Sequence, residues 1–588
     1  SRTQWPLLGA TVIGIMAFSG IGMSPDTTGE FLFSLFAVIG MSLMLSWLLA
    51  VTVTPLFGEY LLKVKGAGDQ NDPYKGVIYA AYRQVLKFSL VHRWLALVTL
   101  LVVTVTSFWA FGFVKQSFFP DSNTPMFFVD YQLPQGADIR ATARDIAEID
   151  QMVLEMDGVE SVASFIGQGA SRFMLTYEPQ QPNTGYGQLI VTTTDRFLID
   201  ELALEVRQKL SAAYPNADVQ TRRLVFGPGA GAKIEARFMG PDAKELRRLA
   251  EQATAIMAEK DFLMDLRQDW QQRELVIVPN FNEERARLAG INRNDLAQTL
   301  DFATQGVTAG SYREGDESIP IIIRPPASER LRVEGLDERL IWSTSEQRYV
   351  PVEQVVNSFS TRAEETLIKR RNRHRTLAVQ ADPVPGRTPA EVLALIRQDI
   401  EAIPLPAGYD FEWGGEYEAS GEAQASLGSQ LPLSFLVMFC ISVLIFGKVR
   451  QPLIIWLVVP MSICGVVAGL LLTQMPFSFT ALLGFLSLSG MLMKNAIVLV
   501  DEIDAQLEEG RESTDAVIYA SVSRIRPVFL AAATTILGMI PLLGDAFFAS
   551  MAVTIMGGLA FASILTLIAV PVLYALLFRI RTASDYKV

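Results

Sequence analysis

Eight long stretches of apolar residues divide the chain, and each is long enough to cross a membrane as a helix. Most are separated only by short polar segments, which argues against the buried helices of a soluble core. One long and mostly polar segment interrupts the series after the third stretch. The predicted membrane spans lie at about 6–23, 31–56, 94–114, 431–447, 452–475, 479–501, 526–543 and 549–578.

Lysine and arginine gather in the short segments on one side of these spans. They occur in 57–93, which we interpret as a cytoplasmic amphipathic connector, and in the later loops on the same side. The loops 24–30 and 544–548, on the other side, contain neither residue. Because short cytoplasmic loops are rich in Lys and Arg, the pattern predicts that residues 115–430 lie outside the cytoplasm.

The long polar segment alternates between strand-like and helix-like patterns. Its first part is close to the order strand, helix, strand, strand, helix, strand, with one strand to spare, since RFMLTYEP and GQLIVTTTD are both predicted strands between the two helices. This order is that of split βαβ, or ferredoxin-like, units. A linker at 227–232 leads into a second unit, which a β-rich insertion at about 307–362 interrupts. The predicted fold class is a membrane α-helical bundle that carries a large α+β domain.

One predicted span contains a positive charge just past its middle, at Lys494, followed by Asn495. A lysine at this depth costs roughly 2.5–3.5 kcal/mol on insertion scales, so it requires a carboxylate partner or a function. No carboxylate lies inside any of the eight spans, because Asp501 and Glu502 come at the end of theirs. Either Lys494 extends toward the nearer membrane surface, or its partner belongs to a segment outside this sequence.

Composition and charge exclude several other classes of protein. The net charge of −12 gives no reason to expect a nucleic-acid partner. Cys440 and Cys464 both lie in apolar runs, and His92 and His374 are far apart, so we expect no disulfide framework and no metal site. We find no nucleophile–base pair and no phosphate-binding loop, and therefore expect neither an enzyme nor a cofactor.

Four stretches resemble one transporter family: GMLMKNAIVLVDEID, SRIRPVFLAAATTILGMIPLL, SFFPDSNTPMFFVDYQLPQGA and VTAGSYREGDESIPIIIRPP. The chain is similar over its whole length to inner-membrane pumps of the resistance–nodulation–division (RND) family, in the hydrophobe/amphiphile (AcrB-like multidrug) exporter branch. The family has twelve membrane helices, of which the eight here correspond to the fifth to the twelfth. Since the sequence also starts at Ser1 without a Met, we expect a piece of a longer protein whose N-terminal half is missing.

The resemblance implies a division into parts, with porter subdomains of βαβ type outside the membrane. In this numbering the parts are helices five and six (1–56), the connector (57–93), helix seven (94–114), the third porter subdomain (115–228), the fourth (229–306 and 363–420), half of the docking subdomain (307–362), and helices eight to twelve (421–588).

The resemblance also implies a function. Such pumps are proton-driven antiporters that export amphiphilic or hydrophobic compounds. They are homotrimers in the inner membrane of Gram-negative bacteria, and they work with a periplasmic membrane-fusion adaptor and an outer-membrane channel. Residues 115–430 would then lie in the periplasm.

The family's proton relay provides candidate residues here. Lys494 and Arg524 match the relay's lysine and arginine, and Asn495 is adjacent. The two aspartates that complete the relay would come from the missing N-terminal half. Where the family often has a threonine after the arginine, this sequence has alanine, with Thr534 and Thr535 one turn further on as possible substitutes. Arg524 is equally explained as a plain cytoplasmic anchor.

Phe165 and Phe173 are candidates for the substrate pocket, because the family lines its pocket with aromatic residues of the third porter subdomain. Ordinary core packing is the alternative for both. Two other functions stay open: a metal-ion exporter of the same family, and a non-transporting receptor or secretion accessory protein. Methionine thioethers suit monovalent copper, but most methionines of the polar segment follow helix or strand patterns typical of a core.

Overall fold

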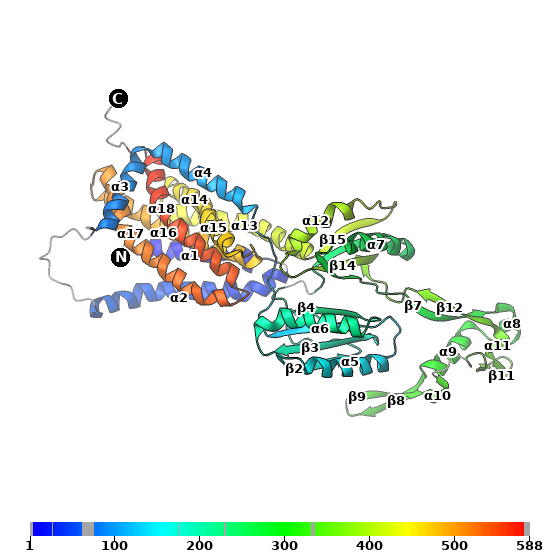
Figure 1. The fold of residues 1–588 in the computed structure, drawn as a ribbon. Helices are drawn as coiled ribbons and strands as arrows, with labels where there is room; N and C mark the ends of the chain where they lie inside the picture. The colour runs from blue at the N-terminus through cyan, green and yellow to red at the C-terminus, as the bar shows by residue number, and fades with distance from the viewer. Residues whose placement is uncertain are drawn as a thin grey trace. The chain divides into compact units, whose positions relative to one another are not determined.

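The computed structural model describes residues 4–25, 27–61, 74, 76–174, 176–227, 231–330 and 335–580 (Figure 1). Parts of the predicted connector (62–73 and 75) and of the predicted linker (228–230) lie outside the described residues. The chain forms two compact units. The first takes in the described parts of Ser1–Leu133, Asp138–Asp269 and Lys369–Val588, and the second consists of Pro134–Ala137 and Trp270–Ile368.

Eight helices in the described residues are long and apolar enough to cross a membrane. Each of the eight predicted stretches coincides with one of them to within a few residues at its ends, and the fourth helix starts well before its apolar run, at Glu416. The total of twelve in the family stays an expectation. The helices are α1 (Gln4–Gly22), α2 (Thr27–Leu61), α4 (Arg93–Phe111), α13 (Glu416–Phe446), α14 with α15 (Arg450–Val458 and Ile463–Thr473), α16 (Phe479–Glu508), α17 (Ser513–Met539) and α18 (Ala549–Leu577).

The bundle is built around α16 and α18, where 67% of the most apolar segment is buried, whereas only 6% of that segment is buried in α2 and in α4. Close approach between helices depends on small residues. An added Cβ at Gly557 of α18 would lie 2.7 Å from the carbonyl oxygen of Gly465 of α15. Such backbone contact between helices is typical of membrane bundles, in which lipid provides little hydrophobic driving force. A shorter amphipathic helix, α3 (Val77–Val91), lies in the predicted connector.

The first α/β part of unit 1 has one antiparallel sheet with the strand order β2-β3-β1-β4. Along the chain its elements follow the order βαββαβ, and the side chains between the sheet and its two helices form one apolar core. They are β1 (Met126–Gln132), α5 (Ile139–Leu154), β2 (Val159–Ile166), β3 (Tyr186–Thr193), α6 (Ile199–Ala213) and β4 (Asp218–Arg223).

The extra strand predicted at RFMLTYEP was wrong. The described residues of 172–179 form turns and irregular backbone between β2 and β3. Pro179 ends this segment and Pro182 follows it closely, and proline lacks the N–H that a strand inside a sheet must donate. Without this strand the order of elements is that of a ferredoxin-like unit.

The second α/β part has one five-stranded sheet with β14 (His374–Pro383) near its centre. β14 pairs with β13 (Arg370–Arg371), β5 (Ile234–Met239) and β6 (Leu263–Gln268). β15 (Asp410–Gly415) pairs with β5. Helices α7 (Ala243–Ala258) and α12 (Pro389–Glu401) contact these strands. Two chain segments far apart in sequence therefore share one sheet, as the predicted interruption of this unit requires.

Unit 2 contains the predicted insertion 307–362 and also residues 270–306. The larger extent has two causes: β7 (Glu274–Phe281) pairs with β12 (Val356–Glu364), and α8 (Glu283–Leu288) and α9 (Arg293–Thr304) share an apolar core with the β10–β11 pair. The remaining elements are β8 (Val307–Glu314), β9 (Glu317–Ile323), α10 (Ala327–Arg330), β10 (Leu340–Ser343), β11 (Arg348–Pro351) and α11 (Val352–Val355). Besides the predicted insertion, unit 2 thus includes residues 134–137, 270–306 and 363–368, and the division into porter and docking subdomains stays a prediction.

Asp265 of β6 is a buried carboxyl in the α/β part, with a side chain only 5% exposed. Nη2 of Arg207 in α6 lies 2.8 Å from Oδ1 of Asp265, and its positive charge favours the charged form of the carboxyl. The geometry of this contact is not that of a hydrogen bond. Burial outweighs this attraction and raises the pKa of Asp265 to about 7.

We expect replacement of Gly557 by leucine to destabilise the bundle by about 1–3 kcal/mol, because the side chain would force α15 and α18 apart. The measurement is the apparent melting temperature of the purified protein in detergent. Gly538→Leu in α17 is the matched control, since no atom lies within 4 Å of a Cβ added there. Equal melting temperatures for the two variants would contradict the close-packing explanation.

Asp265 predicts a pH dependence of stability. In the unfolded chain an aspartate has a pKa of about 3.9, so between roughly pH 4 and 7 the unfolded state releases a proton that the folded state keeps. Stability therefore falls as the pH rises through this window, by up to about 4 kcal/mol at 1.36 kcal/mol per pH unit. Asp265→Asn should remove that fall. The melting temperature of the variant minus that of the parent protein should therefore increase from pH 4 to pH 7. Asp261→Asn, at an exposed position, should follow the parent at every pH.

Candidate functional site

Lys494 lies in the middle of the most buried part of α16, yet its own side chain is exposed. Its neighbours Met493 and Ala496 are each 1% exposed, whereas Lys494 is exposed and Asn495 is half-buried. Within the described residues, no hydrogen bond or ion pair to Lys494 occurs. The helix thus presents an unpaired cation at the surface of an apolar bundle, at a depth where the sequence predicts membrane.

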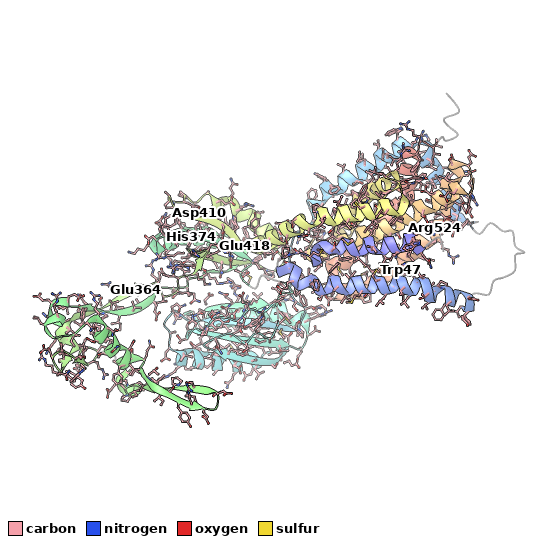
Figure 2. The ribbon with its side chains drawn as sticks, turned by 180° about the vertical axis from the view of Figure 1, so that it is seen from behind. Trp47, Glu364, His374, Asp410, Glu418 and Arg524 are labelled. Carbon is pink, nitrogen blue, oxygen red and sulfur yellow. The ribbon has the colours of Figure 1, made fainter. Side chains whose placement is uncertain are left out.

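Arg524 of α17, labelled among the membrane helices in Figure 2, has a partner that the sequence did not indicate. Its Nη2 forms an ion pair with Oε2 of Glu502 in α16. The other oxygen of Glu502 accepts a hydrogen bond from Nε2 of Gln506 at 3.1 Å. Arg524 therefore joins two membrane helices, which a plain cytoplasmic anchor would not do.

Thr534 and Thr535 lie about ten residues further along α17, roughly 15 Å from Arg524 by helix rise. Their hydroxyls donate to carbonyls of their own helix, those of Leu530 and Ala531, at 2.9 Å. The structure thus brings Glu502 and Gln506 to Arg524 and does not bring the two threonines there.

Sequence reasoning missed Glu502 and Gln506 because it treated the acidic residues after Lys494 only as a helix end. Their spacing of four residues is a usable signal, since it puts both side chains on one face of the helix. Asp504 faces another way: Tyr574 of α18 and Gln451 of α14 both donate to it, the latter at 3.0 Å.

Phe165 and Phe173 lie on the side of the first sheet opposite to α5 and α6. Phe165 is partly buried in a small cluster with Phe128 and Tyr177. Phe173 is 49% exposed, and its ring centroid lies 4.9 Å from that of Tyr177 and 6.4 Å from that of Phe128. The two predicted aromatic residues therefore meet in one cluster, which is open at Phe173.

A buried polar network lies next to this cluster, centred on Asp130 of β1. Arg222 forms an ion pair with one oxygen of Asp130, while Tyr186 and Gln188 donate to the other, the latter at 2.8 Å. Burial alone would raise the pKa of Asp130, but the charge and hydrogen bond of Arg222, with the bonds from Tyr186 and Gln188, lower it overall. The Asp130 carboxylate is thus charged, and both of its oxygens already have partners.

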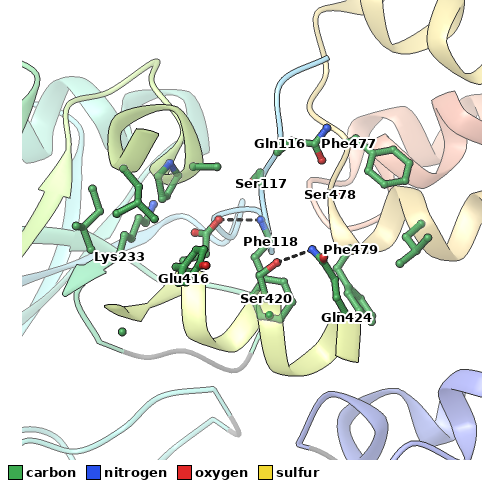
Figure 3. Close-up of a pocket in the computed structure, with 18 of the residues that line it drawn as sticks. Gln116, Ser117, Phe118, Lys233, Glu416, Ser420, Gln424, Phe477, Ser478 and Phe479 are labelled. Atoms are coloured by element: carbon green, nitrogen blue, oxygen red, sulfur yellow. Dashed lines mark hydrogen bonds between the residues drawn. The ribbon is translucent and has the colours of Figure 1, made fainter. Parts of the chain in front are cut away.

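A cavity of about 700 Å³ opens where the first residues of α13 meet the segment before β1 (Figure 3). Aromatic residues such as Phe118, Phe477 and Phe479 share its lining with polar groups. The backbone N–H of Phe118 donates to Oε1 of Glu416 at 2.8 Å. A mostly apolar wall with a few polar groups is typical of a pocket for a small amphiphilic molecule.

In the parts of the chain that the structure describes, no group of three or more His, Cys, Asp or Glu residues is arranged to hold a metal ion. Methionine was the other candidate ligand. Met257 and Met156 lie in apolar cores at 0% and 9% exposure, and Met174 packs in the aromatic cluster of Phe165. These methionines occupy packing positions.

Comparison with known proteins gives the family. The model of the AcrB/AcrD/AcrF family matches residues 1–578. The nickel and cobalt resistance protein CnrA of Cupriavidus metallidurans is 26% identical over 83% of this chain and 46% of its own length. The multidrug resistance protein MdtC of Yersinia enterocolitica is 23% identical over 95% of this chain and 54% of its own.

The crystal structure of a heavy metal efflux pump has the same fold, with a TM-score of 0.77 and 21% identity over 98% of this chain and 58% of that one. The chain spans about half the length of the curated relatives it matches. The family model runs along the whole chain and lends no support of its own to a missing N-terminal half, which stays a prediction. This family consists of transporters and not of enzymes. The chain belongs to the AcrB/AcrD/AcrF family of RND efflux transporters.

Proposed function

We propose that this chain provides the membrane and porter parts of a proton-driven efflux transporter. The observation that carries the proposal is Lys494, a cation without a partner in the described chain, on a helix that is otherwise buried. A charge at this depth is costly, and charged residues inside membrane helices usually mark ion or proton pathways. We infer that a carboxylate from a segment outside this sequence pairs with Lys494.

Proton coupling follows from that pairing by simple electrostatics. Lys494 would favour the charged form of the incoming carboxylate. Protonation of the carboxylate would cancel the attraction and release the helix, so that one proton shifts a two-state packing of helices. Arg524 and Asn495 are proposed to belong to the same relay. A role for Thr534 and Thr535 has less support, because both bond within their own helix.

For the cargo we propose a transition-metal cation in place of the amphiphilic compounds expected from the sequence. The similarity to CnrA, a nickel and cobalt resistance protein, supports this choice. The cation site would then include residues outside those that the structure describes, since the described ones form no cluster of His, Cys, Asp or Glu ligands. Asp130 is unsuited as a ligand, because Arg222 neutralises it.

An amphiphilic compound is the second candidate cargo. The open aromatic cluster supports it, because Phe173 offers a half-exposed ring beside Tyr177 on a rigid sheet. MdtC, a multidrug resistance protein, also matches nearly all of the chain. On this alternative, Phe165 and Phe173 would contact the cargo.

The proposed setting is the inner membrane of a Gram-negative bacterium, with residues 115–430 in the periplasm. We propose that the transporter is a homotrimer that works with a membrane-fusion adaptor and an outer-membrane channel. The β8–β9 hairpin of unit 2 supports assembly, since Tyr312, Ile319 and Ile321 are all exposed on it. Apolar side chains on an exposed hairpin are typical of a surface that another protein covers.

We expect Lys494→Met to abolish transport while the protein is still made and assembled. The substitution keeps the length and apolar stem of the side chain and removes its charge. Lys494→Arg should retain transport only in part, because guanidinium and ammonium groups differ in geometry. The measurement is cargo efflux from cells, together with size-exclusion chromatography of the purified protein. Full transport by the methionine variant would mean that Lys494 only extends to the membrane surface.

The two cargo proposals predict different growth phenotypes. In a host without its own efflux pumps, the transporter should raise the tolerated concentration of Ni²⁺ and Co²⁺ several-fold and leave the toxicity of amphiphilic dyes unchanged. Lys494→Met should remove the gain. Phe173→Ala should not affect metal resistance, whereas on the amphiphile proposal it should weaken dye resistance. Resistance to dyes alone would overturn the metal proposal.

A further inference from the structure

The end of α16 that follows Lys494 contains a group of buried polar atoms without partners. Gln506 is 6% exposed and donates Nε2 to Glu502, but within the described chain its own Oε1 is buried without a donor. Nε of Arg524 is likewise buried without an acceptor there, although Nη2 of the same side chain binds Glu502. An unpaired donor and an unpaired acceptor thus flank one carboxylate.

Buried polar atoms of this kind need a hydrogen-bond partner, and a water molecule can be that partner. Leaving a buried donor or acceptor unpaired costs about 1–3 kcal/mol, and native proteins usually avoid this cost with a protein partner or a bound water. A water that accepts from Arg524 and donates to Gln506 would satisfy both orphan atoms next to Glu502. The arrangement therefore indicates a hydrated site inside the helix bundle.

The surroundings of Glu502 fit a place where protons leave the membrane. Glu502 follows Lys494 by eight residues, about 12 Å along the helix, toward the side that the basic loops identify as cytoplasmic. Arg524 faces it from α17, and the ring of Tyr74 lies 5.8 Å from that of Tyr519 in the same helix as Arg524.

The other carboxylates nearby on α16 have interactions of their own. Asp504, on the same helix, is held by Tyr574 of α18 and Gln451 of α14. Asp501 also has a partner, and α1, which packs against α16, contains no ionisable residue. Glu502 is thus the carboxylate of this region that combines a cation partner with buried amide and guanidinium atoms.

We propose that Glu502 is the proton-release residue at the cytoplasmic end of the relay; the proposal rests on the proton-driven function proposed above. A proton arriving through water binds to the Glu502 carboxylate and gives the neutral acid. The ion pair with Arg524 then opens, while Arg524 keeps its own proton. The acid next gives its proton to cytoplasmic water, and the ion pair re-forms. Gln506 positions the water and does not itself titrate.

The test is proton release by inverted membrane vesicles that contain the transporter. The lumen is acidified and loaded with Ni²⁺ or with a cationic dye, whichever cargo the growth experiment selects. A pH-sensitive dye in the bath reports protons that leave on the cytoplasmic face. We expect Glu502→Gln to slow cargo-dependent proton release roughly tenfold to a hundredfold, the size of effect typical of a lost acid–base group. Glu502→Asp should retain most of the rate.

Chemical rescue separates proton transfer from a structural role. Formate added to the bath can carry the proton that the substituted side chain cannot, so it should restore much of the rate to Glu502→Gln. Formate should also raise the rate of proton release in Gln506→Met, a variant that keeps the ion pair of Glu502 and Arg524 and loses the amide. Glu509→Gln, an exposed change at the same helix end, should behave as the unsubstituted protein with and without formate.

Two results would overturn the proposal: an unchanged rate in Glu502→Gln, or a slow rate that formate does not restore. If Glu502→Gln fails to assemble, Gln506→Met is the deciding variant. Slower proton release that formate restores supports the proposal, and any other result for this variant contradicts it. The proposed function fails separately, if the unsubstituted protein shows no cargo-dependent proton release.

Discussion

A positive charge inside an apolar helix is the constraint on which the membrane part of this protein depends. Lys494 is costly to insert, and the described part of the chain provides no carboxylate at its level. The helix around it is packed on most sides, so the lysine cannot be explained by a generally polar environment. The side chain of Lys494 is exposed on this helix. A carboxylate paired with it, as proposed above, would let a proton control the charge balance at this position.

The other cation proposed for the relay is paired within the described chain, unlike Lys494, and this difference separates two regions of one helix. Arg524 is held by Glu502, which also ties α17 to α16. Close helix packing, illustrated by the backbone contact of Gly465 and Gly557, makes the bundle a rigid medium for such ties. In a rigid bundle, a change of charge at one residue is more readily converted into a movement of whole helices.

The α/β parts combine rigid sheets with specialised faces. One face of the first sheet is packed by α5 and α6, and the opposite face combines the aromatic cluster with the network of Asp130. Because Asp130 is bound by three side chains, it helps to order this face of the sheet. The same feature makes that carboxylate a poor ligand for a metal cation.

Much of the architecture was predictable from the sequence. Apolar runs located the membrane helices because a span in lipid must be long and continuous, and period-two and amphipathic patterns located most strands and helices of the α/β parts. Lys494 was identifiable because a charge in an apolar run is conspicuous. Phe165 and Phe173 were recognisable as candidates, although only folding shows that they share a cluster.

Contacts between distant residues were decided only by the tertiary structure. Nothing local pairs Glu502 with Arg524, because they lie on different helices and meet only when α16 and α17 pack. Residues 270–306 join the insertion because β7 pairs with β12, a partner more than seventy residues away in sequence. RFMLTYEP has the composition of a strand, but its described residues form turns and irregular backbone, and the sheet consists of β2, β3, β1 and β4 without them. Composition and periodicity record what each segment prefers, whereas pairing depends on which surfaces the fold brings together.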